Sequence, residues 1–361
     1  MKIYVHGGLN KTGTSFLQSV LERNAKFLRD HGIAYCNSKS GYGNAADICF
    51  ALRAGDIKRL RSLLNKHRIE AERWSCSSVL LSSELFYHDL IEPEKRSVFF
   101  RELALAQYET PKLLLFFRDP KDHAVSCYCH RSGTRNLEHF ENWVRNTYEF
   151  PRELQSFLHA MACGIDMDVS IRAYTNKNIA MEMADWLGIR HFPDMTRAVE
   201  NRSVNANEAK LLNWMYERDP LGAMAVRAAL KSLNPEEKAD DQRLRSHWRA
   251  DAARSFVPLQ DDLLSLERFA GMQLFSHGAV KSPGVMDEDG ISLSETQVKT
   301  VISALFLLKW HKRLRWKVAN LIRRCSALKF ASVRRDSAND SIKNTEFLSC
   351  RFTKNDFRGI K

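Results

Sequence analysis

The sequence has no long apolar run and no recognisable leader. No stretch reaches the roughly 18 consecutive apolar residues of a membrane-spanning helix, and the longest candidate, Val301 to Leu308, is about half that length. The N-terminus, Met1 to Val5, lacks the apolar region and the small-residue cleavage site of a secretory signal. We therefore expect neither an integral membrane protein nor a secreted one.

Paired cysteines are also absent. The eight cysteines are scattered along the chain, and no two of them have the CxxC spacing. A zinc ribbon or a disulfide framework depends on such regular spacing. The sequence therefore argues against both and favours a reducing, cytoplasmic compartment.

Excess charge is almost absent from the body of the chain. The formal net charge is +12, but residues 305–361 hold fifteen Lys and Arg against four Asp and Glu, a net charge of +11. The other 304 residues hold 40 basic and 39 acidic side chains, a net charge of +1. Because a nucleic-acid-binding domain needs a basic surface of its own, this distribution argues against nucleic acid as a partner. The basic character belongs to a C-terminal tail.

The chain has the composition of a folded protein with a large core. It has 361 residues, of which 44% are hydrophobic and 27% charged, which suits one large domain with an appendage. Short apolar runs alternate with helix-like patterns, which is typical of a parallel sheet covered by helices on both faces. We predict an α/β fold with strands at Lys2–His6, Ser78–Ser83, Lys112–Arg118 and Asp168–Tyr174.

The pattern becomes helical after about residue 205 and predicts three regions. Residues 1–277 form the α/β domain, and residues 278–300, which include Pro-Gly and several acids, form a linker. Residues 301–361 form a basic helical extension that is partly disordered.

A glycine-rich turn follows the first predicted strand. Such a turn, placed between a strand and a helix, lets backbone N–H groups and the helix N-terminus hold a phosphate. Gly8 and Gly13 have the GxxxxG spacing of a nucleoside-triphosphatase loop, but Thr14 stands where that motif requires lysine. The lysine, Lys11, comes two residues before Gly13 instead, which weakens the interpretation as a kinase or NTPase.

Two separate motifs resemble those of one enzyme family. The run Lys11-Thr12-Gly13-Thr14-Ser15 resembles the 5′-phosphosulfate loop of sulfotransferases that use 3′-phosphoadenosine 5′-phosphosulfate (PAPS), in the form common in bacterial carbohydrate sulfotransferases. Arg118 ends a predicted strand and Ser126 follows eight residues later, which resembles the family's 3′-phosphate motif. Arg202, in a loop before a helical run, is a third, weaker match for a nucleotide ligand. The resemblance covers about residues 1–275.

The resemblance implies PAPS as the sulfuryl donor, no metal cofactor and a role for each matched residue. Lys11 neutralises charge on the leaving oxygen, and Arg118 and Ser126 hold the 3′-phosphate. Glu84, at the end of a predicted strand, resembles the glutamate base of the glycan-modifying branch, and His88 is the rival base. The 5′-phosphate is held by Thr12, Gly13, Thr14 and Ser15.

The acceptor is not readable from the sequence, and the resemblance alone favours a saccharide or glycolipid. The tail mixes tryptophan with cations from Lys309 to Lys317. This composition suits an amphipathic helix at an anionic membrane surface and equally a solvated basic helix packed on the body. We expect a cytoplasmic sulfotransferase, with a peripheral position at the inner membrane face as an extension of that view. The alternatives are a P-loop kinase or NTPase and a non-catalytic peripheral membrane-binding protein with a degenerate nucleotide fold.

Overall fold

A computed structural model describes residues 1–36, 43–163, 168–175, 178–196, 204–233, 239–275 and 296–308 of the chain. The chain divides into two compact units, Met1–Leu305 and Phe306–Lys361. Nearly all of the described residues belong to the first unit, so the fold below is the fold of that unit.

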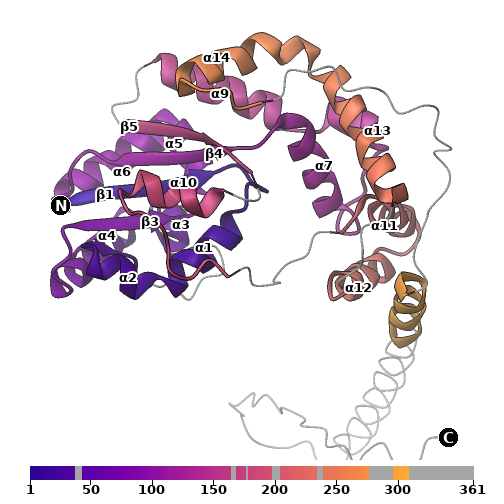
Figure 1. Cartoon of the computed structure of the whole chain (residues 1–361), viewed down its shortest axis with the longest axis horizontal. Helices are drawn as coiled ribbons and strands as arrows, with labels where there is room; N and C mark the ends of the chain where they lie inside the picture. The colour runs from indigo at the N-terminus through magenta and orange to yellow at the C-terminus, as the bar shows by residue number, and fades with distance from the viewer. Residues whose placement is uncertain are drawn as a thin grey trace, which may run out of the picture. The chain divides into compact units, whose positions relative to one another are not determined.

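A five-stranded, all-parallel sheet forms the centre of the first unit (Figure 1). The strand order is β2-β3-β1-β4-β5, and β1 is paired with β3 on one side and with β4 on the other. The predicted α/β class with a parallel sheet flanked by helices is confirmed. The strands are β1 (Lys2–Gly8), β2 (Ile33–Ala34), β3 (Ser78–Ser82), β4 (Lys112–Phe117) and β5 (Asp168–Ala173).

Strands β3 and β4 are apolar on both faces because helices cover both faces. Alternate residues of a strand point to opposite sides of the sheet. Along β4, Leu113 and Leu115 lie in one hydrophobic cluster, whereas Leu114 and Phe116 lie in the other. This two-sided burial explains why β3 and β4 read in the sequence as continuous apolar runs.

One face of the sheet is covered by three helices, α1 (Thr14–Arg23), α2 (Ala25–Asp30) and α10 (Ile179–Trp186). The sequence predicts one helix through Leu17 and Leu28, but the helix is interrupted at Asn24. The buried amide of Asn24 donates to the Val20 carbonyl at 2.8 Å and to the Asp194 carbonyl at 2.7 Å. The interruption therefore joins this face to a segment 170 residues away in the sequence.

The opposite face packs against helices contributed by the connections that follow β2 and β3. Phe86 and Phe99 are fully buried there, with ring centroids 5.4 Å apart. The sequence pattern does not locate these helices individually, and it does not predict β2, which is only two residues long. The helices are α3 (Ala46–Arg53), α4 (Ile57–Arg73), α5 (Phe86–Ile91) and α6 (Pro93–Leu105).

The remaining helices form a second layer beside the sheet, in which α13 runs alongside α7 (Figure 1). The Asp241 carboxylate accepts from the Ala206 and Asn207 amides at 2.7 and 3.1 Å and so caps α11. Residues 296–308 are helical, and this helix includes the last five residues of the predicted linker. The layer consists of α7 (Pro120–Arg131), α8 (Phe140–Asn146), α9 (Phe150–Ala162), α11 (Ala206–Arg218), α12 (Pro220–Lys231), α13 (Ala239–Ser255) and α14 (Gln260–Ala270).

The strand order puts the switch point of the sheet, where open parallel sheets form a ligand-binding crevice, between the carboxyl ends of β1 and β4. The chain leaves β1 toward the β2 side of the sheet and leaves β4 toward the β5 side. In open parallel sheets, the point where neighbouring connections diverge in this way is where ligands bind. The two sequence motifs follow β1 and β4, so both lie at this point.

Candidate functional site

The loop after β1 turns sharply into α1. Lys11 and Gly13 both have positive φ, at 67° and 75°. The Thr12 hydroxyl donates to the Leu9 carbonyl at 2.6 Å and closes the turn. α1 then begins at Thr14 with Gly13 as its N-cap residue, so the positive end of the helix dipole faces the crevice.

Both the positive φ of residue 13 and the close approach of neighbouring side chains favour glycine at this position. A Cβ atom at this position would lie 2.6 Å from Cε2 of Tyr174 and 3.2 Å from Cδ1 of Ile179. A larger residue would therefore displace the tyrosine ring, which comes from the end of β5.

Arg118 joins the two predicted motifs. Its Nη1 donates to the carbonyl oxygen of Lys11 at 3.1 Å, across a sequence separation of 107 residues. Its guanidinium carbon lies 5.4 Å from the centre of the Tyr174 ring. The strand-end arginine and the glycine-rich loop thus meet at one place.

Ser126 lies on α7, the helix that follows Arg118. Asp119 caps this helix by accepting from the Lys121 amide at 3.0 Å. Ser126 is buried, with 8% of its surface exposed. It shares a helix face with His123 and His130, which are three residues before it and four after it.

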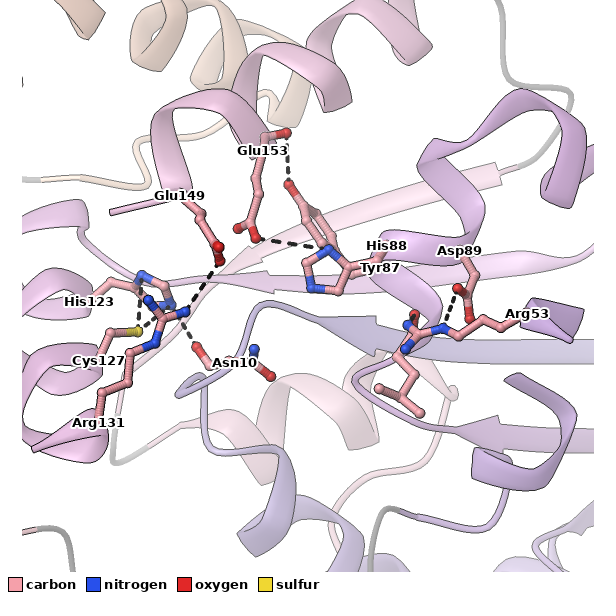
Figure 2. Close-up of polar contacts among 11 residues, drawn as sticks. Asn10, Arg53, Tyr87, His88, Asp89, His123, Cys127, Arg131, Glu149 and Glu153 are labelled. Atoms are coloured by element: carbon pink, nitrogen blue, oxygen red, sulfur yellow. Dashed lines mark hydrogen bonds and ion pairs between the residues drawn. The ribbon is translucent and has the colours of Figure 1, made fainter. Parts of the chain in front are cut away.

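His123 ties α7 to the loop after β1, a contact that the sequence did not indicate. Its Nε2 lies 2.6 Å from the Asn10 carbonyl and its Nδ1 lies 2.5 Å from the Tyr148 hydroxyl. Burial lowers the pKa of His123 to about 4, so the ring is neutral at physiological pH and its Nε2 donates to Asn10. Figure 2 shows His123 and Cys127 on one side of Asn10.

Glu84 lies beside the start of α1. The Thr14 hydroxyl donates to Oε2 of Glu84 at 2.9 Å. The Glu84 carboxylate also acts electrostatically on Lys11. The predicted base and the predicted lysine are therefore neighbours.

His88, the second predicted base, lies on α5 opposite α9. Its Nδ1 is 3.9 Å from Oε1 of Glu153, and Figure 2 shows the two side chains facing each other. Burial, followed by the positive charge of Arg53, lowers the pKa of His88. The protonated form of the imidazole is therefore disfavoured, so His88 is a weaker proton acceptor than a free histidine.

Glu153 is a titratable group that the sequence pattern does not single out. Burial, reinforced by the negative charge of Glu149 and opposed by Arg131, raises the pKa of Glu153 to about 7. Nothing in the amphipathic pattern of α9 distinguishes this glutamate from a surface residue, because its burial comes from helices distant in the sequence.

Two cations of α12 lie within electrostatic reach of Lys11. Burial lowers the pKa of Lys11, and Lys231 and Arg227 of α12 add to this effect, while Cys127 and Glu84 oppose it. The sequence pattern does not single out the α12 cations, because they lie more than 200 residues from the glycine-rich loop.

The other predicted ligands have different surroundings. Ser15 is exposed at the start of α1, whereas Thr12 and Thr14 are buried and their hydroxyls donate within the protein. Arg202 lies outside the described residues. Within the part of the chain that is described, no group of three or more His, Cys, Asp or Glu side chains is placed to hold a metal ion.

None of the helices in the described ranges combines the length and the apolar character needed to cross a membrane.

Comparisons of the chain with models of protein families, with curated proteins and with solved structures give no match.

Proposed function

We propose that the chain is a PAPS-dependent sulfotransferase whose donor site is the crevice between β1 and β4. The observation that carries the proposal is the 3.1 Å hydrogen bond from Arg118 to the Lys11 carbonyl. It brings together two anion-binding motifs that are each apparent in the sequence alone. A donor with phosphates at both its 5′ and 3′ positions needs two such groups within one molecule's length.

The residues around the crevice suit a doubly phosphorylated nucleotide. In this proposal, the loop after β1 is a P-loop-type turn in which the first amides of α1 and the hydroxyl of Ser15 hold the 5′-phosphate. Arg118 offers its remaining N–H groups to the 3′-phosphate, and Ser126 adds a hydroxyl. Arg202 remains a proposed third ligand.

Transfer requires alignment and charge stabilisation more than covalent protein chemistry. The acceptor oxygen forms a bond to sulfur as the bond from sulfur to the 5′-phosphate oxygen breaks. Lys11 stabilises the negative charge that develops on that leaving oxygen, and the acceptor proton passes to a base.

Glu84 and His88 are the two candidates for the general base that accepts the acceptor proton. Glu84 has the favourable position, because it touches Thr14 at the first turn of α1. His88 has the favourable side-chain type, because a free imidazole titrates near neutral pH, and its Nδ1 lies 3.9 Å from Oε1 of Glu153. Substituting Glu84→Gln and His88→Asn separates them, because only loss of the base abolishes turnover while donor binding is retained.

The acceptor is proposed to be a saccharide or glycolipid, in the cytoplasm. Tyr87, Trp143 and Tyr148 are core residues with at most 8% of their surface exposed, so they are not available to stack on a sugar ring. Residues 301–361 are proposed as a C-terminal extension that binds an anionic membrane surface. Most of this extension lies outside the described residues.

Donor binding is the direct test. We expect 3′-phosphoadenosine 5′-phosphate (PAP), the released product, to raise the melting temperature of the protein, and ADP with Mg²⁺ to have no comparable effect. Turnover of labelled PAPS against a panel of glycans and glycolipids then identifies the acceptor. Stabilisation by ADP and Mg²⁺ alone would instead favour the kinase or NTPase alternative.

A further inference from the structure

Two cations on α12 share one face of the helix beside the proposed donor site. Arg227 and Lys231 are four residues apart, so their side chains are neighbours on the helix surface. Both lower the pKa of Lys11, so they lie within electrostatic reach of the loop after β1.

Two contacts fix the position of the Arg227 side chain, and they leave part of its guanidinium without a hydrogen bond to a described residue. Its Nη2 donates to the His130 carbonyl of α7 at 2.8 Å. Its stem packs closely against Gly133, where a Cβ atom would lie 3.3 Å from Cδ of Arg227. Its Nε is buried and has no hydrogen-bond partner among the residues that the structure describes. Because Nε is covered by protein atoms, a bound anion would meet the outer N–H groups of the guanidinium instead.

The described part of the chain places no acidic side chain to balance this pair. Across these residues, no carboxylate lies within ion-pair distance of Arg227 or Lys231, and Arg227 lowers the pKa of Lys231 further than burial alone. The pKa of the neighbouring His130 is lowered to about 4, first by partial burial and then by the positive charges of Lys11, Arg227 and Lys231. The position of Lys231 is explained by a favourable interaction of its positive charge with the C-terminal end of α12. The same interaction does not extend to Arg227, which lies before the last turn of α12.

We propose that Arg227, Lys231 and His130 form a subsite for an anionic group of the acceptor, so that the acceptor is a saccharide carrying a sulfate, phosphate or carboxylate group. This inference rests on the proposed function, in which the loop after β1 and the Arg118–Ser126 pair already bind the two phosphates of the donor. The α12 cations are then left for a third anion, close to the reacting centre at Lys11.

The test compares two matched saccharides, maltotetraose and sulfated maltotetraose, on the full chain with and without saturating PAP. We expect the sulfated probe to bind the wild-type protein at least tenfold more tightly than the neutral one. An Arg227→Gln/Lys231→Gln variant should lose at least tenfold in affinity for the sulfated probe and keep its affinity for PAP within twofold. In the wild type, the sulfated probe should also raise the pKa of His130, followed by NMR.

A Lys58→Gln/Arg59→Gln variant is the control, because it removes the same charge from the exposed surface of α4. It should bind both probes as the wild type does, which separates the α12 subsite from general attraction to a basic protein. A matching loss of PAP affinity in the α12 variant would assign these cations to the donor and overturn the inference. Equal binding of the two probes by the wild type would also overturn it. Failure of the wild type to bind PAP would instead refute the proposed function, and the saccharide measurement without PAP reports on the subsite separately.

Discussion

At the residue scale, the proposed reaction gives Lys11 and Arg118 different tasks, although the Arg118 side chain contacts the Lys11 backbone. Lys11 carries its charge into a partly buried crevice, where an electrostatic interaction is stronger than in water. Arg118 supports the backbone of the same lysine and keeps further N–H donors for a ligand. A loss at Lys11 should therefore appear in the chemical step, and a loss at Arg118 in donor affinity.

We predict that Lys11→Ala lowers kcat by about 10²–10³-fold, the effect of removing one group that stabilises a developing charge. Arg118→Ala should mainly weaken PAP binding, by about tenfold or more, because it removes charge-assisted hydrogen bonds of about 1.5–3 kcal/mol. Labelled-PAPS turnover and calorimetric titration with PAP measure the two effects. Full activity in Lys11→Ala would refute the role of the lysine.

Gly13 offers a second prediction, with a matched control. Gly13→Ala adds a methyl group 2.6 Å from the Tyr174 ring at a φ of 75°, so it should displace Tyr174 and the Arg118 side chain above it. Gly188 has a φ of 72°, and a methyl group added there would meet no described atom within 4 Å. Gly188→Ala should therefore show only the backbone cost, about 1–2 kcal/mol of unfolding free energy, with PAP affinity unchanged. Gly13→Ala should lose more stability and at least tenfold in PAP affinity, and equal behaviour of the two variants would contradict this account.

The raised pKa of Glu153 leads us to predict that the stability of the protein depends on pH. Its pKa is raised from 4.5 to about 7 in the folded protein, so between these values the folded state keeps a proton that the unfolded chain has released. The contribution of Glu153 to the free energy of unfolding therefore falls as pH rises from about 4.5 to about 7. Glu153→Gln removes this dependence, so the variant should gain stability relative to the wild type across that window, as measured by urea unfolding at several pH values.

Glu149→Gln is the companion variant for that measurement. Glu149 is one cause of the raised pKa of Glu153, so its removal should shift the pH-dependent window downward without abolishing it. A difference between Glu153→Gln and the wild type that does not vary with pH would show that Glu153 does not titrate in this range.

The sequence is informative about some of these residues and silent about others, for a physical reason. Lys11, Gly13 and Arg118 stand at strand ends within short local patterns, and parallel strands bring their ends to one edge of the sheet. Glu153, His123 and Arg227 acquire their properties from burial by helices that are distant in the sequence. No local pattern carries that information.

The same contrast holds at the scale of secondary-structure elements. Strands β3 and β4 were predictable because both of their faces are buried, which makes each a run of apolar residues. Strand β5 is only partly buried and has Ile171 as its one buried residue, so its signal in the sequence is weaker. Strand β2 has two residues, too few to form a pattern. The division between α1 and α2 depends on the contact between Asn24 and Asp194, a tertiary interaction that overrides a continuous helical periodicity.

Helix α7 is attached to the loop after β1 through His123, which gives a prediction at this scale. His123→Ala would remove the donor to the Asn10 carbonyl, so we expect a loss of about 0.5–1.5 kcal/mol of unfolding free energy, the net contribution of one hydrogen bond, and weaker PAP binding. Because the pKa of His123 is about 4, these effects should be the same from pH 6 to pH 8. His31→Ala is the control, since His31 is exposed and its ring lies against the carbonyl of Phe27 in the preceding turn. Unchanged PAP affinity in His123→Ala would show that this attachment does not position the loop.

At the scale of the whole molecule, the nearly neutral body and the basic tail suggest separate tasks. The carboxyl ends of β1 and β4 belong to the first unit, Met1–Leu305, so the tail is not needed to build the proposed donor site. In the proposed attachment, the net charge of +11 in residues 305–361 would supply attraction to an anionic surface, at about 1 kcal/mol for each cation near the membrane. Catalysis and membrane attachment should therefore be separable by truncation.

A chain ending at Leu308 tests this separation, because it keeps the described helix over residues 296–308, including the buried Gln297 and Ala304. We expect the full chain to sediment with vesicles containing phosphatidylserine and the truncated chain to remain in solution, while PAP affinity is the same for both. Vesicles of phosphatidylcholine alone should bind neither chain, and added salt should release the full chain because the attraction is electrostatic. Equal binding of both chains to the anionic vesicles would assign the attachment to the body. The acceptor would then need to reach the crevice without any contribution from the tail.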